Sequence, residues 1–181
     1  MPDPVRDAAV AAAAAVRRLP YAWPAPPDAD AAERDGVGSC ASKHALLARR
    51  LDAVGVPSLP LLAVGPLVPA VLAGDPDLAE GADLVEVHEC LTVLTPWAGP
   101  VRVDVTWDPP LVARGLPGGP WDGWSDTPLA VGDAGPGWAV PRDGLRAAKE
   151  GLRRRLYGPG ERDVRDRVLA ALSRRLAAWR G

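Results

Sequence analysis

The chain has 181 residues, of which 48% are hydrophobic and 24% are charged, with a formal net charge of −2. This length and composition are typical of one globular domain with its own core. No run of about 18 apolar residues is free of charge and proline, so we expect no membrane span. Only two cysteines are present, Cys40 and Cys90, and the first residues lack a signal-peptide cleavage site. We therefore expect a cytoplasmic protein with reduced thiols and no disulfide framework.

The first part of the chain carries start and stop signals for two helices. Asp3 followed by Pro4 predicts a helix start, and helical spacing of apolar residues continues up to an arginine pair. Residues 21–38 are punctuated by proline and glycine and are predicted to form a loop. Ser39 is a good N-cap, and the helix formers after it predict a second helix that ends at Gly55.

The middle of the chain has the patterns of β-strands. A short apolar stretch at 58–64 and two further runs at 84–95 and 101–107 predict strands, the last two joined by a tight turn. Between the first and second strands, residues 65–81 are expected to be irregular, with a helical turn at about 68–72.

The last part of the chain lies outside this pattern of strands. Residues 108–141 are rich in glycine, proline and tryptophan and predict a long wrapping segment that its tryptophans anchor to the core. Two amphipathic helices follow, from about Leu145 onward. We predict a single domain over residues 1–181, with a core at about 19–111 and with 112–181 as the wrapping segment and C-terminal helices.

Charge is unevenly distributed along the chain. From Arg142 onward there are 12 basic and 5 acidic residues, and the net charge of the preceding part is therefore strongly negative. A basic segment can bind nucleic acid or lie against an acidic part of its own chain. Because the segment lacks a nucleic-acid-reading motif and interleaved aromatic residues, we expect the second arrangement and no nucleic-acid partner. Lysine occurs only at Lys43 and Lys149, to which we attach no mechanism.

Cys40 is the first candidate for chemistry. It lies in the first turn of the helix predicted after Ser39 and follows a glycine-containing loop. The unpaired N–H groups and the dipole of a helix N-terminus favour a thiolate, which is the nucleophilic form of cysteine. The Cys40 N–H can also help to stabilise an oxyanion. Position alone is equally compatible with a small buried residue at the start of a helix.

A nucleophilic cysteine needs a base, and the chain offers only His44 and His88. For His44, one helical turn after Cys40, we prefer a local hydrogen bond within the helix. His88 lies on a predicted strand, and Asp104 on the strand expected to pair with it, so these two side chains can lie opposite or diagonal. A carboxylate beside a histidine orients the ring and supports the imidazolium. The alternative is that Asp104 faces solvent.

Two segments that contain these residues resemble transglutaminase-like proteins, a superfamily with a papain-like arrangement of cysteine, histidine and aspartate. The family's cysteine segment is similar to GSCASKHALLARRLDAVGVPS. Its histidine strand, tryptophan-bearing turn and aspartate strand are similar to EVHECLTVLTPWAGPVRVDVTWDPPL. The intervals between the three residues also suit the family, and the resemblance covers about Leu19 to Leu111.

The resemblance implies an α+β fold in which the cysteine-bearing helix packs against an antiparallel sheet, with extra C-terminal helices. It implies that Cys40 is the nucleophile, that His88 is the general base and acid, and that Asp104 orients His88. The expected chemistry is acyl transfer or hydrolysis of a peptide, amide or small acyl substrate, without a cofactor.

Three further residues enter through the same resemblance. The stretch RLPYAWP is similar to the tyrosine-bearing segment that precedes the family's cysteine, which implies an oxyanion contact from Tyr21. Cys90 stands where the family often has an aromatic residue, so we expect Cys90 and Trp107 to shape the pocket. Independently of the resemblance, Lys43 lies three residues after Cys40 and is either a partner of the thiolate or, as we prefer, a solvated charge.

Two alternatives to a cysteine enzyme remain open. The same fold can serve as a catalytically silent binding module, because an intact set of residues does not prove turnover. Alternatively, Cys40, His44, His88 and Cys90 could form a two-cysteine, two-histidine zinc site. The zinc interpretation leaves Asp104 unexplained, and we expect no metal.

Overall fold

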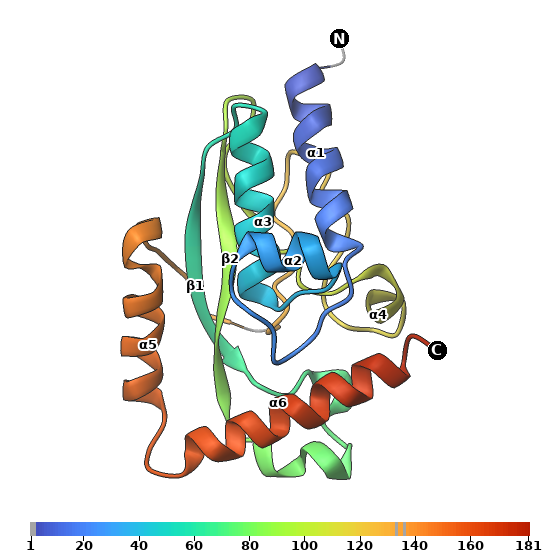
Figure 1. The fold of residues 1–181 in the computed structure, drawn as a ribbon, viewed down its shortest axis with the longest axis vertical. Helices are drawn as coiled ribbons and strands as arrows, with labels where there is room; N and C mark the ends of the chain where they lie inside the picture. The colour runs from blue at the N-terminus through green and yellow to red at the C-terminus, as the bar shows by residue number, and fades with distance from the viewer. Residues whose placement is uncertain (1–2, 133, 136) are drawn as a thin grey trace.

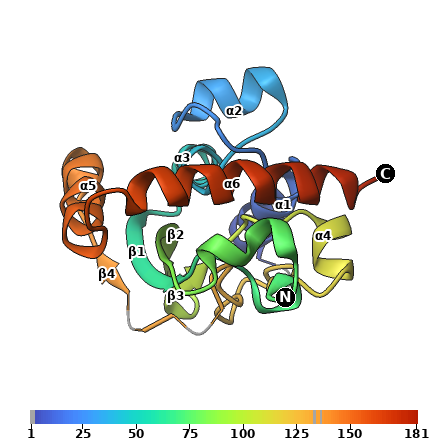
Figure 2. The same cartoon turned by 90° about the horizontal axis from the view of Figure 1, so that it is seen from below.

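The computed structural model describes residues 3–132, 134–135 and 137–181. Helices surround one four-stranded antiparallel sheet, which makes this an α+β fold (Figure 1, Figure 2). The α-helices are α1 (Pro4–Arg17), α2 (Ala29–Asp35), α3 (Cys40–Ala53), α4 (Pro109–Ala113), α5 (Leu145–Leu156) and α6 (Glu161–Ala178). The strands are β1 (Ser58–Pro66), β2 (Val85–Thr95), β3 (Gly99–Val103) and β4 (Trp138–Ala139). Short 3-10 helices occur at η1 (Ala70–Leu72), η2 (Pro76–Gly81) and η3 (Arg142–Gly144).

The sheet has the strand order β3-β2-β1-β4. β1 and β2 pair along their full length, with Ala63 of β1 opposite His88 of β2. β3 is much shorter and pairs with β2 only from Leu91 to Thr95. The half of β2 that carries His88 therefore has no β3 residue beside it, and the chain leaves the sheet just before Asp104.

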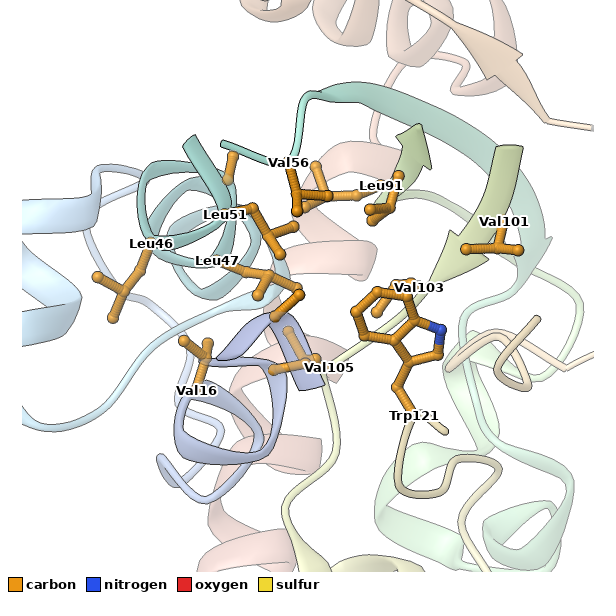
Figure 3. Close-up of a cluster of buried hydrophobic side chains, with 14 of the residues drawn as sticks. Val16, Leu46, Leu47, Leu51, Val56, Leu91, Val101, Val103, Val105 and Trp121 are labelled. Carbon is orange, nitrogen blue, oxygen red and sulfur yellow. The ribbon is translucent and has the colours of Figure 1, made fainter. Parts of the chain in front are cut away.

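The main core lies between α3 and the sheet, with α1 against the other side of α3 (Figure 3). Burial of apolar surface is the main favourable contribution to folding and fixes how α3 lies on the sheet. The buried side chains labelled in the close-up are Val16, Leu46, Leu47, Leu51, Val56, Leu91, Val101, Val103, Val105 and Trp121. Because Leu47 and Leu51 face the sheet from successive turns, the N-terminus of α3 is held at a fixed place near β2.

The structure confirms most of the predicted elements and corrects three. The predicted loop at 21–38 contains α2, which the Asp28 side chain caps by accepting a hydrogen bond from the Ala31 N–H. The segment 108–141, predicted to be a long wrapping segment, contains α4 and the short strand β4. The predicted strand at 101–107 ends at Val103, because the backbone after it bonds to side chains and not to β2.

The basic C-terminal part lies against the acidic part of the same chain, as expected. Helix α6 crosses the lower end of β1 and β2, and α5 stands beside β1 (Figure 1, Figure 2). The ion pairs that join this part to earlier segments are Lys149–Glu89, Arg153–Glu86, Arg165–Glu86, Arg167–Glu80, Arg175–Asp75, Arg180–Asp108 and Arg142–Asp52. Within the described ranges, no helix combines the length and the apolar character needed to cross a membrane.

Candidate active site

A cavity of about 1180 Å³ opens at the N-terminus of α3. Its walls come from α3, from β2, from the chain on either side of α2 and α4, and from α5 and α6. Four of the residues singled out from the sequence line it: Tyr21, Cys40, His88 and Trp107. The cavity is thus built from segments that are far apart in the sequence.

Cys40 occupies the first position of α3 and is partly exposed. Ser39 is the N-cap, and its side chain and that of Ser42 form a reciprocal capping box. Gly38 is required just before this cap, because a Cβ there would lie 2.7 Å from the Ser42 hydroxyl oxygen. The predicted helix start is therefore confirmed, and it holds the Cys40 thiol at the positive end of the helix dipole.

His88 and Asp104 form a buried pair. The His88 Nε2 atom lies 2.7 Å from Asp104 Oδ2, and both side chains are almost fully inaccessible to solvent. The predicted contact between these residues is confirmed, whereas the alternative of a solvent-facing Asp104 is wrong. Burial opposes protonation, but the neighbouring carboxylate raises the pKa of His88 to about 10. Because Asp104 occupies Nε2, Nδ1 is the ring nitrogen left to exchange a proton with another group.

The Asp104 carboxylate is held by backbone groups as well. Oδ2 also accepts a hydrogen bond from the Ala130 N–H at 2.8 Å, and Oδ1 accepts one from the Thr106 N–H at 2.9 Å. The Asp104 N–H donates to the Thr127 hydroxyl at 2.7 Å. Burial alone would favour the neutral acid, but the interactions with His88 and these N–H groups hold the Asp104 pKa well below its usual range. Asp104 is therefore a buried carboxylate with a fixed orientation.

His44 is a structural neighbour of this pair. Its Nδ1–H donates to the Cys40 carbonyl at 2.7 Å, which is the local hydrogen bond preferred from the sequence. Its Nε2 accepts a hydrogen bond from the Val105 N–H at 3.0 Å. Burial lowers the pKa of His44 to about 4, so the ring is neutral near pH 7. His44 thus links the start of α3 to the backbone that follows Asp104.

The environment of the Cys40 thiol favours the thiolate. Burial raises the pKa of a thiol, but Lys149 and His88 outweigh burial and bring the Cys40 pKa below its ordinary value. The Lys149 Nζ atom of α5 lies 3.9 Å from Cys40 Sγ and 3.2 Å from the Glu89 carboxylate. Neither Lys149 nor Glu89 was singled out from the sequence. Lys149 lies outside the residues that resemble the family, and only the tertiary structure brings Glu89 of β2 into contact with it.

Lys43 has a role that neither interpretation of the sequence anticipated. Its side chain is fully buried, and Nζ donates to the backbone carbonyls of Arg17 at 3.3 Å, Leu19 at 2.8 Å and Thr106 at 2.7 Å. It is neither a solvated charge nor a bonded partner of the thiol. Burial lowers the pKa of Lys43 to about 7. Both lysines of this arginine-rich chain, Lys43 and Lys149, are buried, and that scarcity was a signal that could have drawn attention to them.

Tyr21 and Trp107 form one wall of the cavity. Their rings make an edge-to-face contact with centroids 4.7 Å apart, and the Trp107 indole donates to the Ala130 carbonyl. Tyr21 is almost fully buried, and burial and the nearby Cys40 raise the pKa of its phenol. Its hydroxyl is therefore a hydrogen-bond donor at neutral pH. The Asp108 carboxylate fixes the Tyr21 backbone by accepting its N–H at 3.0 Å.

Cys90 lies away from the cavity, so the prediction that it shapes the pocket is wrong. It packs with Ala63 and Leu129 in a small apolar cluster, and it is not among the described residues that line the cavity. Burial raises its pKa well above the ordinary value, which is typical of an inert core thiol. Both cysteines are free.

The four residues of the zinc alternative do not converge. Both ring nitrogens of His44 are engaged by backbone groups, Nε2 of His88 is engaged by Asp104, and Cys90 belongs to the separate apolar cluster. Across the part of the chain that the structure describes, no group of three or more histidine, cysteine or acidic side chains is arranged to hold a metal ion.

Comparisons of this chain with protein-family models, with curated proteins and with solved structures found no match. Its function must therefore be inferred from the site itself.

Proposed function

We propose that this protein is a cysteine-nucleophile enzyme that transfers or hydrolyses acyl groups through Cys40, His88 and Asp104. The observation that carries this function is the buried His88–Asp104 pair on the wall of the cavity that also contains Cys40 at the start of α3. Geometry of this kind supplies a nucleophile, a proton carrier and a group that orients the carrier.

The order of the elements supports a transglutaminase-like fold for this proposal. A helix that begins at the cysteine precedes a strand that carries the histidine, and the aspartate follows the antiparallel strand next in the chain. This is the order expected from the resemblance of residues 19–111. Helices α5 and α6 are additions that close one side of the cavity.

The reaction would proceed in two stages. The Cys40 thiolate attacks the carbonyl carbon of an amide, a C–S bond forms, and the carbonyl oxygen becomes an oxyanion near the Cys40 N–H and the Tyr21 hydroxyl. The tetrahedral intermediate expels the amine, which takes its proton from the His88 imidazolium. Water or a second amine then gives a proton to His88 and attacks the thioester, which releases the acyl product and restores the thiolate.

Asp104 would act by electrostatics and orientation throughout this cycle. Its carboxylate stabilises the imidazolium and leaves Nδ1 of His88 free to face the sulfur and the leaving group. Because the Thr106 and Ala130 N–H groups fix Asp104, the His88 ring cannot turn away without breaking its buried hydrogen bond to this carboxylate.

The test is the rate of iodoacetamide labelling between pH 5 and 10, with each alkylated cysteine mapped by mass spectrometry. We expect Cys40 to react at pH 6, with that reactivity lost in His88→Ala, while Cys90 serves as the unreactive reference thiol within the same chain. Circular dichroism shows whether each variant is folded. Incubation with 4-nitrophenyl acetate should then acetylate Cys40 and regenerate it, with release of acetate.

An ordinary thiol profile at Cys40 that ignores His88→Ala would exclude the proposed pair and leave a binding module on this fold. A reactive Cys40 that is acetylated once and never deacylates, by water or by added amines, would also contradict turnover. Only the combination of a low-pH thiolate and repeated acyl transfer agrees with an enzyme.

A further inference from the structure

Helix α5 brings a buried ammonium group to the nucleophile. Lys149 is 8% exposed, and its Nζ atom lies 3.9 Å from Cys40 Sγ and 3.2 Å from Glu89 Oε2. Lys149 is 109 positions from Cys40 in the sequence, and α5 is outside the region of family resemblance. The rest of the site, Cys40 with His88 and Asp104, does not explain why a lysine is buried at this place.

We propose that Lys149 is a charge partner of the Cys40 thiolate, which makes α5 part of the active site. This inference rests on the proposed function, because it assigns a role at the same nucleophile. Lys149 and His88 would supply positive charge to the sulfur from two separate elements, so Lys149 would add to the stabilisation of the thiolate by His88.

Glu89 explains how Lys149 can be present in every state of the reaction. While Cys40 is a thiolate, the ammonium group faces two negative charges, the sulfur and the Glu89 carboxylate. When Cys40 is acylated, the charge on sulfur disappears, and an unpaired buried ammonium would be costly. Glu89 remains as its counter-ion, so Lys149 can stay in place through thioester formation and hydrolysis.

Several other charged side chains that line the cavity form ion pairs with one another. Glu86 pairs with Arg153 of α5 and Arg165 of α6, and Glu150 pairs with Arg154. The titratable and charged groups that line the cavity besides Cys40 are Tyr21, Glu86, His88, Glu89, Arg142, Asp143, Arg146, Lys149, Glu150, Arg153, Arg154 and Arg165. Among the lysine and arginine side chains of this set that the structure describes, Lys149 is the one with a hydrogen-bond contact to Cys40 Sγ.

The experiment compares the iodoacetamide pH profile of Cys40 in wild type, Lys149→Met and Lys149→Arg. Loss of the cation raises the thiol pKa, and a rise of one unit lowers the thiolate fraction about tenfold below the midpoint. A more basic thiolate is also more nucleophilic, with a Brønsted slope of about 0.4–0.5. We therefore expect Lys149→Met to react about threefold more slowly at pH below the midpoint and about threefold faster on the high-pH plateau.

This crossing of the two profiles separates an electrostatic role from a structural one, because a distorted site would lower the rate at all pH values. Lys149→Arg keeps the positive charge and should move the midpoint back toward that of wild type. Glu89→Gln removes the negative charge near the sulfur and should shift the midpoint to lower pH, opposite to Lys149→Met. The matched control is Arg155→Met, which removes one positive charge from an exposed position of the same helix and should leave the profile unchanged.

Failure of this inference and failure of the proposed function have different signatures. If wild-type Cys40 reacts at pH 6 with dependence on His88 but Lys149→Met has the wild-type midpoint, Lys149 is not a charge partner and the enzyme proposal stands. If Lys149→Met and Arg155→Met shift the midpoint equally, the effect belongs to net charge and the inference is wrong. If wild-type Cys40 behaves as an ordinary thiol, the proposed function itself fails.

Discussion

Replacing Asp104 with asparagine preserves the shape of the side chain and removes its charge, so it isolates what the buried carboxylate contributes. Oδ1 accepts one backbone hydrogen bond, from Thr106, and Oδ2 accepts another, from Ala130, in addition to the bond with His88. An asparagine has only one accepting oxygen. In either orientation its NH₂ group faces a backbone N–H, and one buried donor is left without a partner.

The cost of Asp104→Asn can be worked out from these contacts. A buried donor without a partner costs about 1–3 kcal/mol, and loss of a hydrogen bond to a charged group costs about 1.5–3 kcal/mol. Because the amide can still make part of these bonds, we expect the free energy of unfolding to fall by about 3 kcal/mol. Without the carboxylate, the pKa of His88 falls from about 10, so the thiolate–imidazolium pair is populated less at pH 6.

Two measurements check this prediction. Urea unfolding followed by tryptophan fluorescence gives the change in stability. Iodoacetamide labelling of Cys40 at pH 6 should be at least about threefold slower, because a rise of one unit in the thiol pKa lowers the thiolate fraction about tenfold and raises the nucleophilicity of the thiolate about threefold. Asp126→Asn is the matched control, because Asp126 also accepts a backbone hydrogen bond, from Arg102 at 2.7 Å, but is exposed. An Asp104→Asn protein as stable and as reactive as this control would refute the reasoning.

Two further predictions concern buried groups near the site. Burial lowers the pKa of His44 to about 4, below its unfolded value near 6.5, so its contribution to stability is present above pH 6.5 and is lost as the pH falls toward 4. His44→Gln should therefore flatten the decline in urea midpoint between pH 6.5 and 4, and a decline as steep as that of wild type would contradict it. Burial lowers the pKa of Lys43 to about 7, below its unfolded value near 10.4, so the folded protein should gain stability from this group as the pH rises from 7 to 10. Lys43→Met should remove this gain from the urea midpoint, and a gain as large as that of wild type would contradict the prediction.

The sequence alone is sufficient to predict those helices and strands whose signals lie in neighbouring residues. Ser39 before a run of helix formers predicts where α3 begins, because capping depends on neighbours in the chain. Runs of β-branched residues predict β2 and β3, because a strand pattern is also local to its stretch of sequence. The pattern does not predict where β3 ends. These elements place Cys40 at a helix N-terminus and His88 near Asp104, so the sequence by itself determined the candidate residues.

Only the tertiary structure decided how those residues are surrounded. Lys43 looks like a surface charge on a helix, and its burial depends on carbonyl groups at Arg17, Leu19 and Thr106 that no local pattern brings together. Thr127 and Ala130, which form hydrogen bonds with Asp104, lie in a segment whose sequence has neither helical nor strand periodicity.

The contact of Lys149 with Cys40 is the clearest case of this limit. A capping box or an alternating strand can be recognised because its partners are a few residues apart, whereas Lys149 and Cys40 are brought together by the packing of α5 beside the sheet. Such packing depends on the shape and burial of many side chains at once, which a single sequence does not display. The candidate nucleophile was therefore visible in the sequence, whereas the charged groups around it became visible only in the fold.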